Sequence, residues 1–465
     1  MSTLSAERLA RARERCEQAG QGHVLRFAGE LPAAQLDQLL AQLEELDLPR
    51  IARLFATVRE PPAAHAGPRP EPCELIEMGD GEEHRRRDRA AREAGEEALA
   101  AGRVAAFVVA GGQGSRLGFE GPKGRFPVGP ITHRSLFAYH AQRVLATSRR
   151  YGAPAPYWVM TSAANHDSTV AAFEEAEWFG LDREQVGFVT QGMLPAVDRE
   201  GRLLLADKGQ LFMSPDGHGG SLRALQRGGA LERLQQSGVE HLFYFQVDNP
   251  LVPVLDPVFL GLHLLGSAEM SSKVVAKTDP HEKVGILARV GGRAGVIEYS
   301  DLDPALAAAR DEQGRLLYRA GNIAVHAFAL PFVRRLVAQG VELPVHRADK
   351  VVPCIDEQGR PVRPERPNAV KMEQFVFDAL GHAARVVTQE VRREDEFAPV
   401  KNAEGPDSPA TARAALVAQG KRWMAAAGLV VPSGPVEVGP LFALDQAEFA
   451  ANLTGLERGP VFDRS

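Results

Sequence analysis

Residues 104–126, VAAFVVAGGQGSRLGFEGPKGRF, constrain the fold more than any other stretch of this chain. The segment opens with an apolar run that includes β-branched residues, which predicts a strand, Val104–Val109, buried on both faces of a parallel sheet. A turn follows whose glycines allow positive φ and leave backbone N–H groups free to point at a phosphate. The residues that we expect at such a phosphate are Gly111, Gly112 and Gly114, with Arg116 and Lys123 adding positive charge.

Two commoner glycine loops do not fit this segment. The dinucleotide-binding pattern G-x-G-x-x-G, counted from Gly112 and Gly114, puts Leu117 where its third glycine belongs. A Walker A loop ends in Gly-Lys-Ser/Thr, whereas Lys123 follows a proline and precedes a glycine, without a hydroxyl neighbour for a metal. Nicotinamide dehydrogenases are therefore disfavoured, and a thermal-shift titration with NAD would test that exclusion.

Length, charge and cysteine usage narrow the class of protein. The chain has 465 residues, more than one core usually holds, so we expect roughly two or three domains. Its net charge of −6 argues against a nucleic-acid-binding protein and favours small-molecule partners. The scattered cysteines lack zinc-site spacing, and no segment is apolar enough for a signal peptide or a membrane span. We expect a soluble, cytoplasmic protein without membrane or nucleic-acid partners, and the sequence leaves its oligomeric state open.

Hydrophobic periodicity predicts three regions along the chain. Residues 1–95 are expected to form a helical region with a proline-rich linker, and residues 401–465 a small β-rich C-terminal domain. Between them, residues 96–400 alternate strands with helices, which is typical of an α/β domain with a mostly parallel sheet. The expected strands are Val104–Val109, Tyr157–Met160, Val186–Thr190, Leu242–Val247, Lys273–Ala276 and Ile323–Phe328.

Polar residues after these strands are candidate ligands, because small molecules bind at the carboxyl ends of parallel strands. Gln191 directly follows one strand, and its carboxamide can both donate to and accept from a uracil edge. Asp248 follows another, where a single carboxylate can hold Mg²⁺ together with substrate phosphates, although a simple turn cap also fits. Glu298 and Asn322 interrupt apolar segments and suit either sugar hydroxyls or sheet ends.

Three further segments admit a structural or a ligand-binding interpretation. Residues 214–221, SPDGHGGS, allow close approach of backbone to a ligand at Gly219 and Gly220. Residues 371–380, KMEQFVFDAL, are expected to form a helix that buries Phe375, Val376 and Phe377. Lys401 follows a dense charge run, where a solvated loop is the alternative to a ligand site.

The order of these blocks carries more information than any one of them. The series AGGQGSRLG with PKG, then QGMLPA, PDGHGG, VDN, KVVAKT, EYS, AGNIA, KMEQFVFD and REDEFAPVKNA resembles the eukaryotic-type UDP-N-acetylhexosamine pyrophosphorylases and their UDP-glucose pyrophosphorylase relatives. The resemblance covers about residues 95–415. It implies a Rossmann-like nucleotidyltransferase domain over residues 96–400 that forms a UDP-sugar and pyrophosphate from UTP and a sugar 1-phosphate, with Mg²⁺.

The resemblance also implies a role for each candidate residue. Arg116, Lys123 and Lys401 would bind the phosphates, and Asp248 would bind the metal. The implied contacts with uridine, phosphate and sugar are those of Gly111, Gly112, Gly114, Gln191, Gly219, Gly220, Glu298, Asn322 and Phe377. His218 stands where the acetylhexosamine enzymes usually carry Asn and matches the G-H-G of the UDP-glucose relatives, which makes glucose 1-phosphate the alternative substrate. The blocks QGMLPA, AGNIA and KMEQFVFD favour the acetylhexosamine enzymes, so N-acetylglucosamine 1-phosphate is the expected substrate. A non-catalytic UDP-sugar-binding protein is a remote alternative, since such a protein would be expected to lose Lys123, Asp248 and Lys401.

Overall fold

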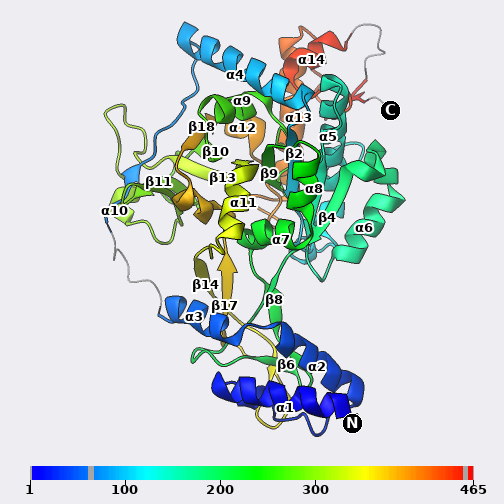
Figure 1. Ribbon diagram of the computed structural model, residues 1–465. Coiled ribbons are helices and arrows are strands. Elements are labelled where there is room, and N and C mark those ends of the chain that lie inside the picture. Colours follow the sequence, from blue (N-terminus) through cyan, green and yellow to red (C-terminus); the bar gives the residue numbers. More distant parts are fainter. Residues whose placement is uncertain (1–2, 61–67, 454–458, 464–465) are drawn as a thin grey trace. The chain divides into compact units, whose positions relative to one another are not determined.

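The computed structural model describes residues 3–60, 68–453 and 459–463 (Figure 1), which divide into two compact units. The first unit contains the described residues of Met1–Ala66 together with Gly192–Gly220 and Glu342–Val376. The second contains the described residues of Gly67–Gln191, Ser221–Val341 and Phe377–Ser465. Whether the chain also folds as three domains divided at residues 95 and 400 stays a prediction.

The second unit is built on a mixed sheet that has ten strands within the described residues. Its parallel part consists, in spatial order, of β9 (His241–Gln246), β2 (Val104–Val109), β3 (Tyr157–Thr161) and β4 (Val186–Thr190). The other strands are β1 (Glu71–Pro72), β10 (Met270–Ala276), β11 (Ile286–Val290), β12 (Arg293–Ile297), β13 (Ala320–Ala329) and β18 (Val386–Val391). β13 pairs antiparallel with β9 and with β10, and β10 forms a further parallel pair with β18, so the sheet is mixed beyond β9. The predicted strands are thus confirmed within a few residues at each end.

Burial explains why β2 lies at the centre of this sheet. Its side chains alternate between the two faces, and both Phe107 and Val108 are buried, as expected for a continuous apolar run. Helix α5 (Leu136–Tyr151) contributes Phe137, and helix α9 (Pro257–Leu265) contributes Phe259, to the core that contains Val108. The glycine loop therefore follows a strand that is packed on both faces.

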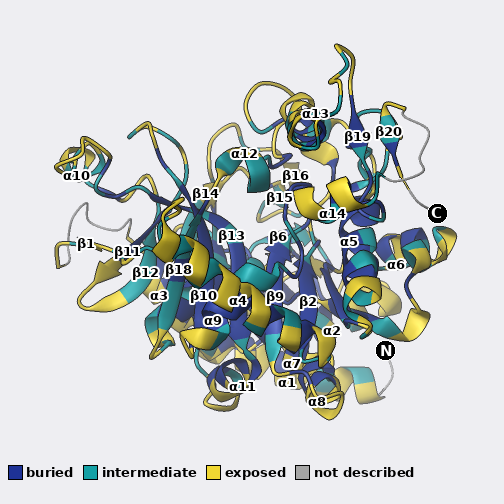
Figure 2. Ribbon diagram, turned by 90° about the horizontal axis from the view of Figure 1, so that it is seen from above, coloured by how far each residue is buried: buried dark blue, intermediate teal, exposed yellow. Residues whose placement is uncertain are grey.

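Helices surround the sheet of the second unit, and their outer faces are exposed (Figure 2). Besides α5 and α9 they are α4 (Glu82–Ala100), α6 (His166–Glu175), α7 (Ser221–Arg227), α8 (Ala230–Gln236), α10 (Pro304–Ala307), α11 (Leu330–Ala338), α12 (Arg393–Glu396), α13 (Pro409–Ala426) and α14 (Gln446–Ala451). α4 has a charged, exposed face, and it also packs closely on α9. A Cβ on Gly95 would overlap the carbonyl of Pro257, and one on Gly261 would overlap the carbonyl of Ala91.

The C-terminal part of the second unit contains less strand than predicted. Its described residues hold the helices α13 and α14 and one parallel pair of two-residue strands, β19 (Glu437–Val438) and β20 (Val461–Phe462). The Glu437 carboxylate is 1% exposed and accepts hydrogen bonds from the Thr132 amide at 2.8 Å and the Tyr139 hydroxyl at 2.7 Å. This buried carboxylate joins the C-terminal residues to the loop before α5.

The first unit combines N-terminal helices with short strands from two later parts of the chain. Its helices are α1 (Thr3–Gln18), α2 (Ala33–Glu45) and α3 (Leu48–Val58). Its strands are β5 (Met193–Pro195), β6 (Leu205–Asp207), β7 (Gln210–Leu211), β8 (Met213–Pro215), β14 (Val345–Lys350), β15 (Cys354–Ile355), β16 (Pro361–Val362) and β17 (Ala369–Gln374). Leu39 and Leu43 of α2 pack in one core with Val197, Val370 and Met372.

The prediction of a helix over residues 371–380 is wrong. Residues up to Gln374 belong to β17, which pairs antiparallel with β14, and a 3₁₀ segment, Val376–His382, follows. Val370 and Met372 are buried while Lys371 and Glu373 are only partly covered, which is the period of two of a strand. This alternation lasts only six residues, and helix-forming residues surround it, so the sequence pattern favoured a helix over a strand.

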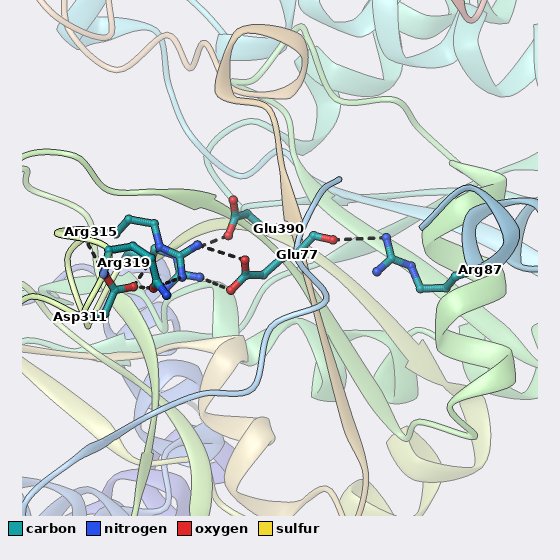
Figure 3. Close-up of polar contacts among 7 residues, drawn as sticks. Glu77, Arg87, Asp311, Arg315, Arg319 and Glu390 are labelled. Atoms are coloured by element: carbon teal, nitrogen blue, oxygen red, sulfur yellow. Dashed lines mark hydrogen bonds and ion pairs between the residues drawn. The ribbon is translucent and has the colours of Figure 1, made fainter. Parts of the chain in front are cut away.

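The proline-rich linker crosses the second unit as an extended strap over its described residues 68–81 (Figure 3). Glu77 binds Arg315 at 3.0 Å and also pairs with Arg319, while its backbone carbonyl accepts from Arg87 at 3.2 Å. Arg319 lies 3.6 Å from Glu390 of β18. The strap is thus joined to β18, to α4 and to the segment before β13.

No helix within the described residues is long and apolar enough to cross a membrane.

Candidate functional site

The residues predicted to follow strand ends meet at one edge of the second unit's sheet. β2, β3 and β4 are in register, so their carboxyl ends lie side by side. The Ala110 amide donates to the Met160 carbonyl at 2.8 Å, and the Gln191 amide donates to the Thr161 carbonyl at 2.8 Å. On the other side of β2 the Val247 amide donates to the Val109 carbonyl at 3.1 Å. The glycine loop, Gln191 and Asp248 therefore leave the sheet at adjacent positions.

The glycines of the loop allow close approach, but they do not have the positive φ that the sequence suggested. In this loop the positive φ angles are those of Gly118, at 66°, and Gly121, at 110°. A Cβ added to Gly111 would lie 2.6 Å from Oε1 of Gln191, whereas one added to Gly112 would meet no atom within 4 Å. Gly111 thus leaves room for the end of the Gln191 side chain, and the exposed Gly112 has open space where a side chain would stand. At Gly114 a Cβ would lie 2.8 Å from the Phe119 ring, so this glycine lets the loop fold on itself.

Lys123 and Asp248 form the central charged pair of this edge. Lys123 Nζ lies 3.6 Å from Asp248 Oδ2, and their side chains are 18% and 13% exposed. The Lys123 amide donates to the Gly112 carbonyl at 3.0 Å, so the loop backbone places this cation. An ammonium and a carboxylate that are both accessible from one side suit a phosphate and a divalent cation that share oxygens.

The chemistry of Asp248 fits a magnesium ion held mainly by substrate. No group of three or more His, Cys, Asp or Glu side chains within the described ranges can enclose a metal. Mg²⁺ in phosphate-transfer sites needs no such cage, because one or two carboxylates, waters and substrate phosphates complete its shell. The Asp248 carboxylate, beside Lys123 and the glycine loop, meets that requirement.

Lys401 is held near Asp248 through the backbone, and Arg116 lies on an exposed part of the glycine loop. The Val400 amide donates to the Asp248 carbonyl at 2.9 Å, which places Lys401 one residue away from the metal candidate. Lys401 itself is exposed, with Nζ 5.7 Å from the centre of the Phe397 ring. Arg116 is exposed in a 3₁₀ turn, Ser115–Leu117, and its side chain has no ion pair within the described residues. Both cations are available to a ligand.

Glu298 and Asn322 both lie next to Gly285. The Asn322 amide donates to the Gly285 carbonyl at 2.9 Å, and a Cβ on Gly285 would lie 3.4 Å from Oε1 of Glu298. Asn322 lies at a bulge, because the pairing of β10 with β13 skips Ile323 and Ala324. Bulges turn side chains out of the regular alternation, and they are common beside binding sites.

Gly219 and Gly220 belong to the first unit, where close packing accounts for both. A Cβ on Gly219 would lie 2.7 Å from the Phe375 amide nitrogen, and one on Gly220 would overlap the Asp216 carboxylate. The His218 ring stacks on Phe375 with 5.1 Å between centroids, and its Nδ1 accepts from the Val376 amide at 3.2 Å. Burial and the nearby His346 lower the pKa of His218 to about 4, so this ring is neutral at pH 7.

Phe377 belongs to the second unit, where it is 5% exposed in the 3₁₀ segment Val376–His382. This burial is the core packing that the sequence predicted for it. Its implied place in a sugar pocket stays a prediction.

Asn165 is a site residue that the sequence reasoning missed. Its side chain is 1% exposed, donates to the Ala110 carbonyl at 2.8 Å and accepts from the Ser162 amide at 2.8 Å. It thereby ties the end of β3 to the start of the glycine loop. The signal that could have found it is the polar stretch TSAANHD directly after a predicted strand, a position equivalent to that of Gln191.

His140 is a second missed residue, and it supports the segment that carries Asp248. Its ring is fully buried, and Nε2 lies 2.9 Å from the Val247 carbonyl. Burial, aided by the Arg143 guanidinium, lowers the pKa of His140 to about 3. The neutral His140 thus fixes the backbone next to Asp248, the candidate metal ligand. Nothing in the sequence pattern of α5 predicts this contact.

Known proteins are similar to this chain in sequence and in fold. A chain from Xenopus tropicalis, UDP-N-acetylhexosamine pyrophosphorylase-like protein 1, is 40% identical over 446 residues, which is 91% of this chain and 86% of the relative. The UDP-N-acetylglucosamine pyrophosphorylase of Saccharomyces cerevisiae is 37% identical over 80% of this chain and 79% of its own length. The crystal structure of the uridine diphosphate N-acetylglucosamine pyrophosphorylase from Trypanosoma brucei matches with a TM-score of 0.83 and 26% identity, covering 99% of this chain and 98% of that chain.

A family model gives the same result over most of the chain. The model described as UTP–glucose-1-phosphate uridylyltransferase matches residues 74–454. This range includes the glycine loop, Gln191, Asp248, Asn322 and Lys401. The chain therefore belongs to the family of UTP–glucose-1-phosphate uridylyltransferases and their UDP-sugar pyrophosphorylase relatives, enzymes that join UTP to a sugar 1-phosphate.

Proposed function

We propose that this enzyme makes UDP-N-acetylglucosamine and pyrophosphate from UTP and N-acetylglucosamine 1-phosphate, with Mg²⁺. The observation that carries the site assignment is the Lys123–Asp248 pair beside the Gly111–Gln191 contact at the carboxyl edge of one sheet. That edge has the exposed backbone of Gly112, the carboxamide of Gln191 and a pair of opposite charges. The names of the pyrophosphorylase relatives from Saccharomyces cerevisiae and Trypanosoma brucei support the choice of sugar.

The proposed reaction needs no protein nucleophile and no general base. The second pKa of a phosphate monoester is about 6, so the attacking sugar-phosphate oxygen is already ionised near neutral pH. That oxygen attacks the α-phosphorus of UTP in line; the new P–O bond forms as the bond to the β-phosphate oxygen breaks, and pyrophosphate leaves with the electron pair. The task of the protein is to place the two substrates and to neutralise charge.

Each side chain then has a role that suits its position. Gln191 pairs with the uracil edge and Gly112 presents its backbone to the nucleotide, while Lys123 and Lys401 neutralise the phosphates and Arg116 faces the leaving pyrophosphate. Asp248 would hold Mg²⁺, whose bound charge offsets that of the phosphates. Glu298 and Asn322 would bond to sugar hydroxyls and Phe377 would line the sugar pocket, while ligand contacts of Gly219 and Gly220 stay a prediction.

His218 favours a second candidate substrate, glucose 1-phosphate, because the G-H-G block resembles the UDP-glucose enzymes. The direct test measures pyrophosphate release with UTP and Mg²⁺ against N-acetylglucosamine 1-phosphate, N-acetylgalactosamine 1-phosphate and glucose 1-phosphate. The proposal expects the largest kcat/KM for N-acetylglucosamine 1-phosphate. A higher value for glucose 1-phosphate would support the second candidate, and a lack of release with all three would contradict the proposed reaction. Cytoplasmic location remains a prediction that fractionation of cells expressing the tagged chain would test.

A further inference from the structure

A buried lysine of the second unit binds two carboxylates that the proposed reaction does not use. Lys273 of β10 is completely buried, and its Nζ lies 2.6 Å from Asp256 Oδ2 and 2.7 Å from Glu396 Oε2. Burial alone would lower the pKa of Lys273, but the two carboxylates outweigh it and raise that pKa above its ordinary value. The ammonium therefore stays charged, and removing it would leave the two carboxylates close together without a cation between them.

The two carboxylates lie on segments that are far apart in sequence. Asp256 is the residue before α9, and its Oδ1 accepts from the Val258 amide at 2.9 Å as a helix cap. Glu396 ends α12, the short helix that precedes Lys401. Lys273 thus joins the sheet to both the start of α9 and the end of α12.

The chain after Glu396 is held against the Asp248–Asn249 turn at three further points. Asn249 Nδ2 donates to the Glu396 carbonyl at 2.6 Å, and Asn249 Oδ1 accepts from the Ala398 amide at 3.1 Å. Two residues later the Val400 amide donates to the Asp248 carbonyl at 2.9 Å. The side chain of Glu396 and the backbone of residues 396–400 therefore act together to bring Lys401 to the metal candidate.

We infer that Lys273 and Glu396 are positioning residues that anchor residues 396–401, and with them Lys401, beside Asp248. This inference rests on the phosphate-binding role proposed for Lys401. Among the residues that the structure describes, the exposed Lys401 side chain contacts the Phe397 ring, with Nζ 5.7 Å from the centroid, and makes no ion pair, so its location depends on the backbone that carries it. A displacement of about 1 Å in a charged group can change a rate by about 100-fold, which gives the anchor a catalytic consequence.

The test uses Glu396→Ala, because this variant leaves Lys273 paired with Asp256 in a neutral core. Glu394→Ala is the matched control, since Glu394 is exposed on the same helix. We expect Glu396→Ala to lower kcat by about 10- to 100-fold with a smaller change in the KM for UTP. Glu396→Gln keeps an oxygen acceptor for Lys273 and should recover part of that loss, while Glu394→Ala should match the unchanged enzyme.

Two readouts separate anchoring from general destabilisation. Hydrogen exchange of the peptide spanning residues 393–401 should quicken in Glu396→Ala while peptides from β2 and β3 keep their protection. In a double-mutant cycle, Glu396→Ala should cost little more when Lys401→Ala is already present. Unchanged exchange and unchanged kcat in Glu396→Ala would overturn the inference, and so would fully multiplicative losses in the cycle. Hydrogen exchange needs no activity, so a missing anchor is distinguishable from an incorrect proposal for the reaction.

Discussion

Lys123 Nζ lies 3.6 Å from Asp248 Oδ2, which is longer than a hydrogen bond of good geometry. The two charges therefore attract each other without being locked together, and each keeps capacity for a further partner. For a site that must bind a phosphate through the amine and a cation through the carboxylate, this loose pairing keeps both groups in place before substrate arrives.

Lys123→Ala should lower kcat/KM by about 10²- to 10³-fold, because it removes one charged stabilising group from the reaction centre. The fold should survive, since Lys123 is partly exposed and its amide bond to Gly112 is made by the backbone. Pyrophosphate release and thermal unfolding would be measured together, with Lys421→Ala as a control on α13. Near-normal turnover in Lys123→Ala would remove this residue from the mechanism.

Substitution of the two leading glycines should give different results. Gly112→Ala adds a methyl group that meets no protein atom within 4 Å, so thermal stability should hold while the KM for UTP rises by roughly 10-fold if nucleotide lies against this backbone. Gly111→Ala places its methyl group 2.6 Å from Gln191 Oε1 and should disturb Gln191 even without ligand. Isothermal titration with UTP would show the effect, and unaltered UTP binding by Gly112→Ala would move the nucleotide away from Gly112.

Asn165→Ala should destabilise the protein by about 1–3 kcal/mol, because it leaves the buried Ser162 amide and Ala110 carbonyl without their side-chain partner. Since the same contact orders the start of the glycine loop, we expect a weaker affinity for UTP as well. Asn165→Asp keeps the acceptor for Ser162 but sets a buried carboxylate oxygen against the Ala110 carbonyl, so its unfolding temperature should fall at least as far as that of Asn165→Ala. Equal stability of all three forms would contradict a bracing role.

His140 should make the protein less stable in acid. An unfolded histidine has a pKa near 6.5, whereas burial lowers the pKa of His140 to about 3, so between these values the unfolded chain binds the extra proton. The contribution of His140 is therefore complete above about pH 6.5 and falls by about 1.4 kcal/mol per pH unit as the pH drops toward 3. His140→Gln retains a donor for the Val247 carbonyl without this titration. Its unfolding temperature should fall less than that of the unchanged protein between pH 7.5 and pH 5.5, and parallel decreases would refute the assignment.

Much of the second unit follows from local patterns in the sequence. Continuous apolar runs predicted β2 and β4 at their observed bounds, because a strand buried on both faces needs no alternation to be recognised. The first unit was harder to predict. Its core joins Leu39 to Val197 and Met372, contacts between residues far apart in the chain that no local period encodes. β17 was mistaken for a helix for the same reason, since its pairing with β14 determines its conformation.

The candidate site shows the same limit at the level of single residues. Strand-end position was enough to predict Gln191 and Asp248, because parallel strands bring their carboxyl ends to one edge. Asn165 and His140 act on backbone carbonyls of other segments, and such contacts appear only in three dimensions. For the loop glycines the sequence indicated where glycine is needed, but steric contact with Gln191, and not positive φ, is the reason at Gly111.

The close contact between α4 and α9 determines where the second unit can be cut from the rest of the chain. Gly95 and Gly261 let the two helices touch backbone to backbone, so α4 is an inner wall of that unit although its other face is charged. A fragment that starts at β2 would expose this surface of α9, the helix whose first turn is capped by the carboxylate that binds Lys273. The shortest autonomous form of the second unit should therefore retain α4 from Glu82 onward, and shorter fragments should be prone to aggregation.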